Sequence, residues 1–348
     1  MFMNKEFADN FWQLVSKSNS ILIRPHINPD DDATASTLAV YHLIREVNPE
    51  KKVEMLATPT ISPRLSFLNN FDKIQVVDDI VGRLNDFDLI IFLDGNFDER
   101  FSNQTEHLRS YKGETICIDH HPTHNYKFSL SLIDSSATSV AELIYFTLME
   151  GRKIIPVPLA EILLLGLMSD THRFQYVTPS QTRVYGMAAR LVEQGNIDVD
   201  IFLSRYSGMS QKAFEVTQEF MRNAEVKEAA GWPKFLSSYI SREFIEGGGY
   251  SVEEVSEGKD NFTGYLKILT EAKWGFLLYP DADGGIKLSL RSRPDEVNVR
   301  EIAEQMGVGS GHDLASGGKF TAEAGRPDSL ECMERIMDWL KVNKSSKV

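Results

Sequence analysis

The chain of 348 residues is poor in cysteine, with only Cys117 and Cys332, and its first residues have no basic-then-apolar signal pattern. Two cysteines provide neither a disulfide framework nor the paired spacing of a zinc site. A long apolar run is also missing. The longest, Leu159–Met168, already contains Glu161, whereas a membrane span needs about 20 residues. We therefore expect a protein of the reducing cytoplasm that does not enter a membrane.

Positive charge is in deficit as well, because 37 Lys and Arg face 50 Asp and Glu and leave a formal net charge of −13. This balance excludes a protein that coats long nucleic acid by charge alone. It still allows an enzyme that admits a short anionic substrate to a locally positive pocket. The chain is 42% apolar and 25% charged, as is usual for a globular protein. Its length suggests two domains at roughly 150 residues each.

The first half of the chain alternates short apolar segments with helical patterns. The segments predicted as strands are Ser20–Arg24, Lys52–Leu56, Lys73–Val77, Asp88–Leu93 and Thr115–Ile118. The stretches predicted as helices are Thr34–Val47, Thr138–Glu150, Leu159–Met168 and Ser180–Gln194. This order predicts an α/β fold, in which a mostly parallel sheet carries helices on both faces.

The second half has a different pattern. Asn196–Val226 is polar and helical, with Gly208 as an interruption, and we interpret it as a connector. After about Gly231, the segments SSYI, WGFLLY and IKLSL predict a small antiparallel sheet, closed by helices near Val299–Met306 and Ser329–Val342. The predicted division is a first domain at 1–195, a connector at 196–228, and a smaller α+β domain at 229–348, with a cleft between the two domains.

Acidic and histidine residues follow several of the predicted strands. His26, Asp30 and Asp32 lie in HINPDDDATAS after the first strand, and Asp94 ends DLIIFLD. Asp119, His120 and His121 end another strand, and Asp170 ends the apolar helix LLLGLM. Ligands of open α/β sheets gather beyond the carboxyl ends of the strands. We therefore expect these side chains to meet at one edge of the sheet.

Each segment also has a simpler interpretation when it is taken alone. Asp30–Asp32 could be turn and N-cap residues, and Asp94 could belong to a turn. His26 could be a structural histidine, and Asp170 a polar end to its helix. Because three strand ends carry such residues together, we favour a functional site.

The chemistry of the residues favours metal ions. Crowded carboxylates repel one another, and two divalent cations would balance four of them. Imidazole and carboxylate without thiolate suit manganese, iron, cobalt, zinc or magnesium better than copper(I) or an iron–sulfur cluster. Two ions about 3.5–4 Å apart can hold a hydroxide and stabilise both oxygens of a phosphoryl transfer.

Four segments together resemble the motifs of the DHH phosphoesterase family, and within it the nanoRNase/pAp-phosphatase branch. In chain order they are HINPDDDATAS, LDGNFDER at Leu93–Arg100, DHHPTH at Asp119–His124 and SDTHRF at Ser169–Phe174. ATSVAEL at Ala137–Leu143 resembles the small-residue segment before a helix of this family. KLSLRS and GVGSGHDLASGG in the second half resemble the DHH-associated C-terminal domain.

The resemblance implies a role for each residue. One ion would be held by His26, Asp30 and Asp94, and the second by Asp32, Asp94, His120 and Asp170, with Asp94 as the bridge. Asp119 would orient an imidazole, His121 would face the scissile phosphate, and Arg100 would shape the second-motif loop. The implied cofactor is a pair of divalent ions, manganese first, with magnesium or cobalt as alternatives.

The chain departs from the family pattern at a few positions. Asp31 stands where the family usually has a small residue, and it could point to solvent or hinder the approach of phosphate. His172 stands where glycine is common, and it could narrow the pocket or add a phosphate contact. Val308 and Ser310 interrupt the usual glycine run. These departures concern substrate geometry more than the metal ligands.

The segment GVGSGHDLASGG at Gly307–Gly318 suits phosphate binding, because glycines let backbone N–H groups approach phosphate oxygens. It does not fit a Walker A loop or a Rossmann fingerprint. The expected substrate-binding residues are Arg291, Ser310, Gly311 and His312, and the nearby Arg293 and Lys319 add positive charge. The alternative is a flexible loop between helices.

We therefore expect a two-metal phosphoesterase that hydrolyses short RNA oligonucleotides from an end and removes the 3′-phosphate of 3′-phosphoadenosine 5′-phosphate. The alternative activities are cyclic-dinucleotide (c-di-AMP) or linear-dinucleotide phosphodiesterase. A single-strand DNA nuclease, a pyrophosphatase, a non-catalytic nucleotide sensor and a scaffold are disfavoured. The expected partners are short oligonucleotides or nucleotide phosphates, without long duplex nucleic acid or membrane, and homodimer formation is left open.

Overall fold

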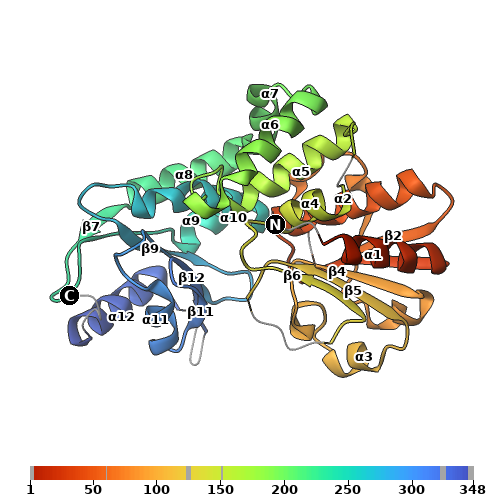
Figure 1. The fold of residues 1–348 in the computed structure, drawn as a ribbon. Helices are drawn as coiled ribbons and strands as arrows, with labels where there is room; N and C mark the ends of the chain where they lie inside the picture. Colours follow the sequence, from red (N-terminus) through yellow and green to blue (C-terminus); the bar gives the residue numbers. More distant parts are fainter. Residues whose placement is uncertain (1–3, 60, 123–126, 150–151, 322–326, 344–348) are drawn as a thin grey trace. The chain divides into compact units, whose positions relative to one another are not determined.

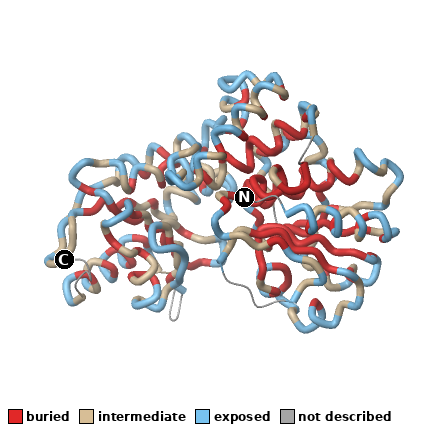
Figure 2. The backbone as a smooth tube through the Cα atoms, in the orientation of Figure 1, coloured by how far each residue is buried: buried red, intermediate tan, exposed pale blue. Residues whose placement is uncertain are grey.

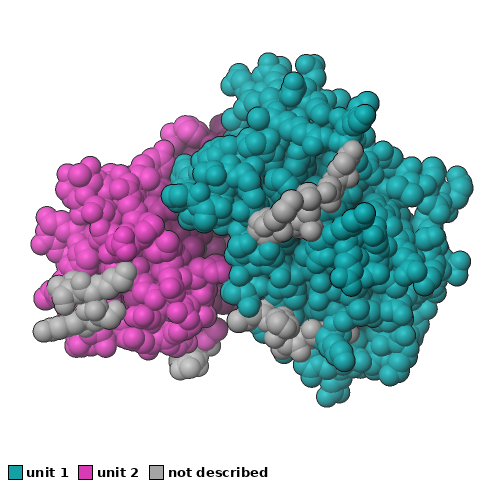
Figure 3. Space-filling view, viewed as in Figure 1, with its two compact units in different colours: residues 1–208 teal, residues 209–348 magenta. Residues whose placement is uncertain are grey.

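The chain is organised as two compact units in a computed structural model that describes residues 4–59, 61–122, 127–149, 152–321 and 327–343. The first unit comprises residues 1–208 and the second residues 209–348 (Figure 3). The division follows Gly208, inside the stretch that the sequence predicts as a connector.

The first unit is built on a six-stranded sheet in which every neighbouring pair is parallel (Figure 1). The strand order is β3-β2-β1-β4-β5-β6. The strands are β1 (Ser20–Pro25), β2 (Lys52–Ala57), β3 (Ile74–Val76), β4 (Leu89–Leu93), β5 (Glu114–Asp119) and β6 (Leu130–Ile133). The parallel sheet expected from the alternating pattern is confirmed.

Helices connect the strands and cover the sheet. The α-helices of this unit are α1 (Lys5–Lys17), α2 (Asp31–Val47), α3 (Thr105–Ser110), α4 (Val140–Leu148), α5 (Val157–Asp170), α6 (Arg183–Gly195) and α7 (Val199–Ser207). The 3-10 helices are η1 (Pro63–Leu65), η2 (Phe71–Lys73), η3 (Val81–Asp86), η4 (Asp98–Arg100) and η5 (Pro179–Gln181).

The central strands β1, β4 and β5 are buried except at the first residues of β1 and β5 (Figure 2). Successive side chains of a strand point to opposite faces, and each face of this sheet has its own apolar core. Ile21 and Ile23 of β1 pack with α1, α2, α4 and α5, whereas Leu22 packs with residues of η3 and α3. Helices on both faces explain why these strands are almost continuously apolar.

One strand and two α-helices of the first unit were not expected from the sequence. β6 is a short edge strand, and its sequence, LSLI, is too brief to stand out. α3 spans only Thr105–Ser110 and has no side-chain cap. α1 is an amphipathic helix capped by the side chain of Asn4, which accepts from the N–H of Phe7 at 2.9 Å.

The second unit contains another six-stranded sheet, in the order β11-β12-β10-β9-β8-β7. Its strands are β7 (Glu225–Lys227), β8 (Phe235–Tyr239), β9 (Trp274–Pro280), β10 (Ile286–Ser292), β11 (Gly309–His312) and β12 (Ala315–Phe320). Its helices are α8 (Gln211–Arg222), α9 (Arg242–Gly248), α10 (Val252–Thr263), η6 (Gly264–Lys267), α11 (Val299–Gln305) and α12 (Ser329–Val342).

This second sheet is mixed, so the expected antiparallel pairing is confirmed for β9 and β10 but is wrong for β8 and β9. β8 and β9 pair in parallel, whereas the other neighbouring strands are antiparallel. Two parallel strands need a long crossover connection, which α9, α10 and η6 supply here. The sequence pattern around Arg242–Lys267 is polar, and it gave no sign of these helices.

The glycine-rich segment forms a hairpin of two strands, β11 and β12, and not a loop. A Cβ atom at Gly309 would lie 2.1 Å from the carbonyl oxygen of Gly317, and one at Gly311 would lie 2.8 Å from that of Ala315. Strand pairing therefore accounts for glycine at both positions. All four residues of β11 are exposed at the edge of the sheet.

Among the described residues, no helix has the length and apolar character needed to cross a membrane.

A tight packing contact gives a first prediction. A Cβ at Gly166 of α5 would lie 2.6 Å from Asp32 Oδ1 and 2.7 Å from the Cβ of Ala141. We expect Gly166→Ala to destabilise the protein by about 1–3 kcal/mol, because overpacking outweighs the gain in helix propensity of ~1 kcal/mol. Gly186→Ala in α6 is the control, since no atom lies within 4 Å of its added Cβ. Urea unfolding measures both, and equal stability of the two variants would contradict the prediction.

Candidate metal centre

The candidate ligands gather because the strands that precede them end in register. Pro25 of β1 pairs with Leu93 of β4, and Leu93 pairs with Ile118 of β5. The next residues along these strands are His26, Asp94 and Asp119, so they emerge at the same edge of the sheet. Asp94 and Asp119 are fully buried, and His26 is 3% exposed.

The first turn of α2 begins at Asp30, whose two carboxylate oxygens have different neighbours. Asp30 is the N-cap, and its Oδ1 accepts from the N–H of Ala33 at 3.0 Å. Its other oxygen lies 3.8 Å from His26 Nε2. One carboxylate therefore caps the helix and also borders the cluster.

Asp32 lies completely buried between three helices. Its carboxylate accepts from the backbone N–H groups of Val140 at 2.7 Å and Ala141 at 3.2 Å, in the first turn of α4. A helix N-terminus favours a negative charge, because its first N–H groups lack partners within the helix. The ATSVAEL segment thus supplies the backbone that holds Asp32.

Asp94 is the centre of the cluster. Its Oδ2 lies 3.6 Å from His26 Nε2, and its Oδ1 lies 3.4 Å from His120 Nε2. His120 Nε2 also lies 3.2 Å from Asp170 Oδ2, at the end of α5. The residues form three overlapping groups with metal-ligand spacing: His26, Asp30 and Asp94; Asp32, His120 and Asp170; and Asp94, His120 and His121.

The backbone at Asp94 has an uncommon conformation. Its φ is +58°, in the left-handed region, which aspartate enters more readily than most residues but still at a cost. Its N–H donates to the carbonyl of Ile118 at 3.1 Å, which holds the residue after β4 against β5. Strain of this kind is often found where a side chain must be aimed at a functional site.

The two adjacent histidines have different partners. His121 Nδ1 lies 2.8 Å from Asp119 Oδ1, a hydrogen bond that orients the ring. The same nitrogen is 3.7 Å from Asp94 Oδ1, and His121 belongs to the group of Asp94, His120 and His121 that has metal-ligand spacing. Its side chain is 31% exposed, compared with 18% for His120. His121 is therefore the more accessible of the two to a substrate.

The charges of the cluster affect one another strongly. Burial alone would lower the pKa of His26, but Asp30 and Asp94 outweigh it and raise the pKa to about 9. Burial, together with the charges of Asp30 and Asp94, raises the pKa of Asp170 to about 7. Burial would also raise the pKa of Asp94, yet His120 and His26 hold it well below its usual range. The field at this edge of the sheet therefore attracts positive charge.

Two unsatisfied polar atoms suit a divalent cation. His26 Nδ1 lies 2.8 Å from the carbonyl oxygen of Ile27, to which it donates, and so Nε2 is left as the ligand atom. His26 Nε2 and Asp94 Oδ1 are buried and have no hydrogen-bond partner among the residues that the structure describes. Buried polar groups rarely lack partners, and a bound ion would satisfy both. The donor set of carboxylate oxygens and imidazole nitrogens fits the expected metals.

Sequence reasoning missed two residues that support the cluster. Arg24 is 1% exposed in β1, and its guanidinium donates to the carbonyls of Leu56 in β2 and Phe101 after η4, which connects these three segments. The sign of this role in the sequence was a positively charged residue within an otherwise apolar strand. Asn96 is fully buried, and its Nδ2 donates to the carbonyl of His121 at 3.1 Å. In the sequence, only its position two residues after Asp94 indicated that Asn96 supports the cluster.

The structure shows the surroundings of two residues that depart from the family pattern, Asp31 and His172. Asp31 does not point to solvent. It is 3% exposed, because Arg64 and Tyr206 bind its carboxylate. His172 is exposed, has a φ of +47°, and stacks on Tyr176 with ring centroids 5.2 Å apart. Arg100 contributes its carbonyl, which accepts from the N–H of Ile27 at 2.6 Å. Thr123 and His124, which end the third motif, lie outside the described residues.

The expected substrate residues lie on the edge of the second sheet. Arg291 of β10 and His312 of β11 both pair with Ala315 of the intervening strand β12. Residues in register across neighbouring strands share a face, so Arg291 and His312 stand on the same face of this sheet. Ser310 Oγ donates to Glu304 at 2.6 Å. Gly311 lies between Ser310 and His312.

Lys319 does not contribute to this group as the sequence suggested. Its ammonium group forms ion pairs with Asp281 and Asp283, at the turn between β9 and β10. Burial would raise the pKa of Asp281, but Lys319 and Lys287 lower it to about 2. Lys319 therefore stabilises a turn, and its charge is neutralised there.

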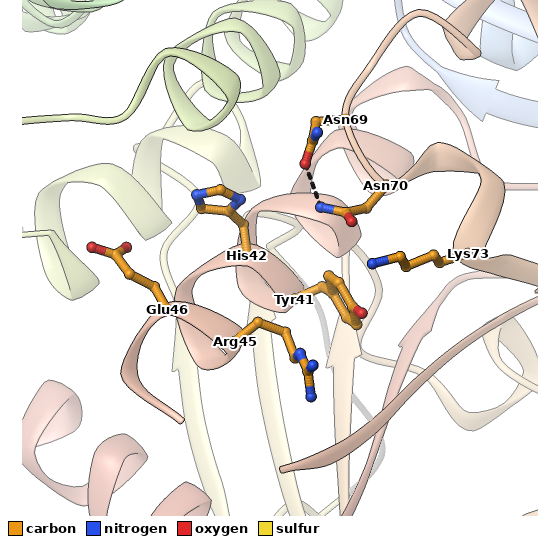
Figure 4. Close-up of a pocket in the computed structure, with 7 residues that line it drawn as sticks. All are labelled: Tyr41, His42, Arg45, Glu46, Asn69, Asn70 and Lys73. Carbon is orange, nitrogen blue, oxygen red and sulfur yellow. Dashed lines mark hydrogen bonds between the residues drawn. The ribbon is translucent and has the colours of Figure 1, made fainter. Parts of the chain in front are cut away.

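A surface pocket on the first unit is separate from the cluster (Figure 4). Its lining residues are Tyr41, His42, Arg45, Glu46, Asn69, Asn70 and Lys73. The ammonium group of Lys73 lies 5.6 Å from the centre of the Tyr41 ring. The pocket is lined in part by residues from the last turns of α2, whereas Asp30 and Asp32 lie at the start of this helix. None of the candidate ligands lines the pocket.

A parallel α/β unit with Asp-His-His at a strand end and further carboxylates on the same edge is the arrangement of the DHH family. Residues 20–167, which lie within the first unit, match the DHH family, N-terminal domain. The recognition made from the motifs is confirmed.

The chain as a whole is similar to proteins with both units. It is 27% identical over 308 residues to the bifunctional oligoribonuclease and PAP phosphatase NrnA of Bacillus subtilis, which covers 87% of this chain and 90% of that protein. The crystal structure of an exopolyphosphatase-related protein from Bacteroides fragilis has a TM-score of 0.81 at 21% identity, covering 97% of each chain. RecJ of Thermus thermophilus, solved in complex with Mn²⁺, has a TM-score of 0.55 at 11% identity, covering 98% of this chain and 55% of RecJ.

The geometry predicts that divalent cations stabilise the protein. We expect Mn²⁺ at 100 times its Kd to add about 2.7 kcal/mol and to raise the Tm of the first unit by about 5–10 °C. Asp94→Asn should abolish most of this shift, since Asp94 borders two groups of ligands. The exposed Asp72→Asn serves as the control. Thermal unfolding with and without Mn²⁺ measures the effect, and a full shift in Asp94→Asn would contradict it.

Proposed function

We propose that this protein is a metal-dependent phosphoesterase that hydrolyses short RNA oligonucleotides from an end and removes the 3′-phosphate of 3′-phosphoadenosine 5′-phosphate. The observation that carries the proposal is the cluster around Asp94, where carboxylates from three segments meet the imidazoles of His26, His120 and His121. The relative from Bacillus subtilis supports the choice of substrates, because its name gives both activities.

Two ions are proposed, with manganese first. His26, Asp30 and Asp94 would hold one ion, and Asp32, Asp94, His120 and Asp170 the other. When bound, the ions would supply a hydroxide from water and stabilise the charge that develops on the phosphate oxygens. Manganese is favoured because a RecJ protein of similar fold was solved with Mn²⁺. Magnesium and cobalt are alternatives with the same preference for oxygen and nitrogen ligands.

Asp119 and His121 are proposed to act on the substrate together. Asp119 accepts from His121 Nδ1 and so fixes the tautomer that carries a proton on that nitrogen. In the protonated ring, Nε2 can then donate to a phosphate oxygen or pass its proton to the leaving oxygen. Asp119 is fully buried, so water cannot compete for this hydrogen bond.

Arg291 and His312 are proposed to bind a phosphate of the substrate, with the backbone and hydroxyl of Ser310 and the N–H of Gly311 beside them. Their shared register at Ala315 and the exposure of β11 support a joint contact. A guanidinium can bind phosphate through two parallel hydrogen bonds.

We propose the cytoplasm as the setting, because both cysteines are free thiols.

The role of His121 can be separated from metal binding. We expect His121→Ala to lower kcat by about 10²–10⁴-fold, the usual contribution of a general acid, with the Mn²⁺ content unchanged. Discontinuous activity assays on the 3′-phosphate nucleotide measure kcat, and elemental analysis of the same samples measures the Mn²⁺ content. If the variant loses one equivalent of Mn²⁺, His121 is a ligand and the proposed division between the two histidines fails.

The second unit should determine how substrates bind. We expect Arg291→Ala and His312→Ala to lower kcat/KM on dinucleotides by about 10- to 150-fold, the loss of one charge-assisted hydrogen bond, mainly through KM. Lys234→Ala is the control, because it removes an exposed charge from the same unit. Wild-type protein should cleave di- to tetranucleotides faster than 20-mers, with cyclic di-AMP included for comparison. Unchanged kinetics in both variants, with folding verified by circular dichroism, would remove these residues from substrate binding.

A further inference from the structure

Asp31 is a third carboxylate in the first turn of α2, between the candidate ligands Asp30 and Asp32. Successive residues of an α-helix point about 100° apart, so the three side chains leave the helix in different directions. Asp30 borders His26 and Asp94, and Asp32 borders His120 and Asp170. Asp31 turns away from both groups and is bound elsewhere in the same unit.

The partners of Asp31 come from distant parts of the sequence. Its Oδ2 accepts from Arg64 Nη2 at 2.5 Å and from the hydroxyl of Tyr206 at 2.7 Å. The side chain of Asp31 is 4% exposed, and Tyr206 is 9% exposed. Burial and the charge of Asp31 raise the pKa of the Tyr206 hydroxyl, so it keeps its proton and donates.

The segments that carry these partners are themselves fixed. η1 contacts α7, and Phe67 packs edge-to-face on Phe202 with ring centroids 5.9 Å apart. The guanidinium of Arg205 lies 4.8 Å from the centre of the Phe67 ring. The guanidinium of Arg64 lies 5.5 Å from the ring centre of Tyr206. The two partners of Asp31 therefore come from elements, η1 and α7, that pack against each other.

We infer that Arg64 and Tyr206 are positioning residues for the metal ligands, because they bind Asp31 and thereby fix the rotation of the first turn of α2. The same contacts keep the additional carboxylate of Asp31 out of the cluster, where it would add a negative charge. This inference rests on the proposed metal site. It gives a function to Asp31, one of the residues at which the chain departs from the family pattern.

The test is the affinity for Mn²⁺, measured by calorimetry on the full chain. Tyr206→Phe removes one hydroxyl, and we expect the Kd for Mn²⁺ to rise by up to about 10-fold. This is the lower end of the range for direct partners of a metal ligand, because Tyr206 acts through Asp31. Activity should recover as Mn²⁺ is raised. Tyr111→Phe is the matched control. It also removes one hydroxyl hydrogen bond, to the carbonyl of Phe87 at 2.9 Å, but on the opposite face of the sheet.

A second set of variants tests the charge. Arg64→Met should weaken Mn²⁺ binding when Asp31 is present, because a buried carboxylate loses its cation. In the Asp31→Asn background, the same change should cost less than about threefold, because the neutral amide does not need a cation. Equal effects of Arg64→Met in the two backgrounds would contradict the charge argument.

The outcomes separate this inference from the proposed function. If wild-type protein binds Mn²⁺ and Tyr206→Phe binds it with the same Kd, the inference fails and the proposed function stands. If Tyr111→Phe weakens binding as much as Tyr206→Phe, the effect is one of general stability, and the inference fails too. If wild-type protein binds no Mn²⁺, both fail.

Discussion

The structure of the first unit depends on how it tolerates negative charge at one buried edge of the sheet. Asp32 and Asp94 are almost completely buried, and Asp30 and Asp170 lie beside them. Like charges at this distance would destabilise the fold unless positive charge compensates for them. The protein supplies part of that compensation itself, through the imidazoles of the cluster and the N–H groups at the start of α4. A divalent cation supplies the remainder in the function that we propose.

The packing around Asp32 follows from the same constraint. To bring backbone N–H groups within 3.2 Å of a buried carboxylate, helices α2, α4 and α5 must approach closely. Small residues permit this approach, and a Cβ at Gly166 would lie 2.7 Å from Ala141 and 3.3 Å from Ala35. The small residues before and within these helices, which the sequence shows as ATAS and ATSVAEL, are thus part of the site.

Five of the six strands of the first sheet, their parallel pairing and the gathering of acidic and histidine residues at one edge could be predicted from the sequence, because each depends on local pattern and on the common edge of parallel strands. The partners of Asp31 could not, since Arg64 is 33 residues and Tyr206 is 175 residues away. The hairpin of β11 and β12 was also missed. Glycine has low strand propensity, and only the close pairing with Gly317 explains its use at Gly309. Which nitrogen of His121 faces Asp119 likewise requires coordinates.

The departures from the family pattern are accommodated without any change in the candidate ligands. Val308 packs partly buried against the core of the second unit, and its carbonyl accepts from the N–H of Lys319 at 2.7 Å. Ser310 is exposed and bonds to Glu304, while Asp31 is held by its own partners in the first unit. Each change is therefore compensated within its own unit. Since the residues proposed for metal binding and those proposed for phosphate binding lie on different sheets, substitutions on β11 can alter substrate preference while the ligand cluster stays the same.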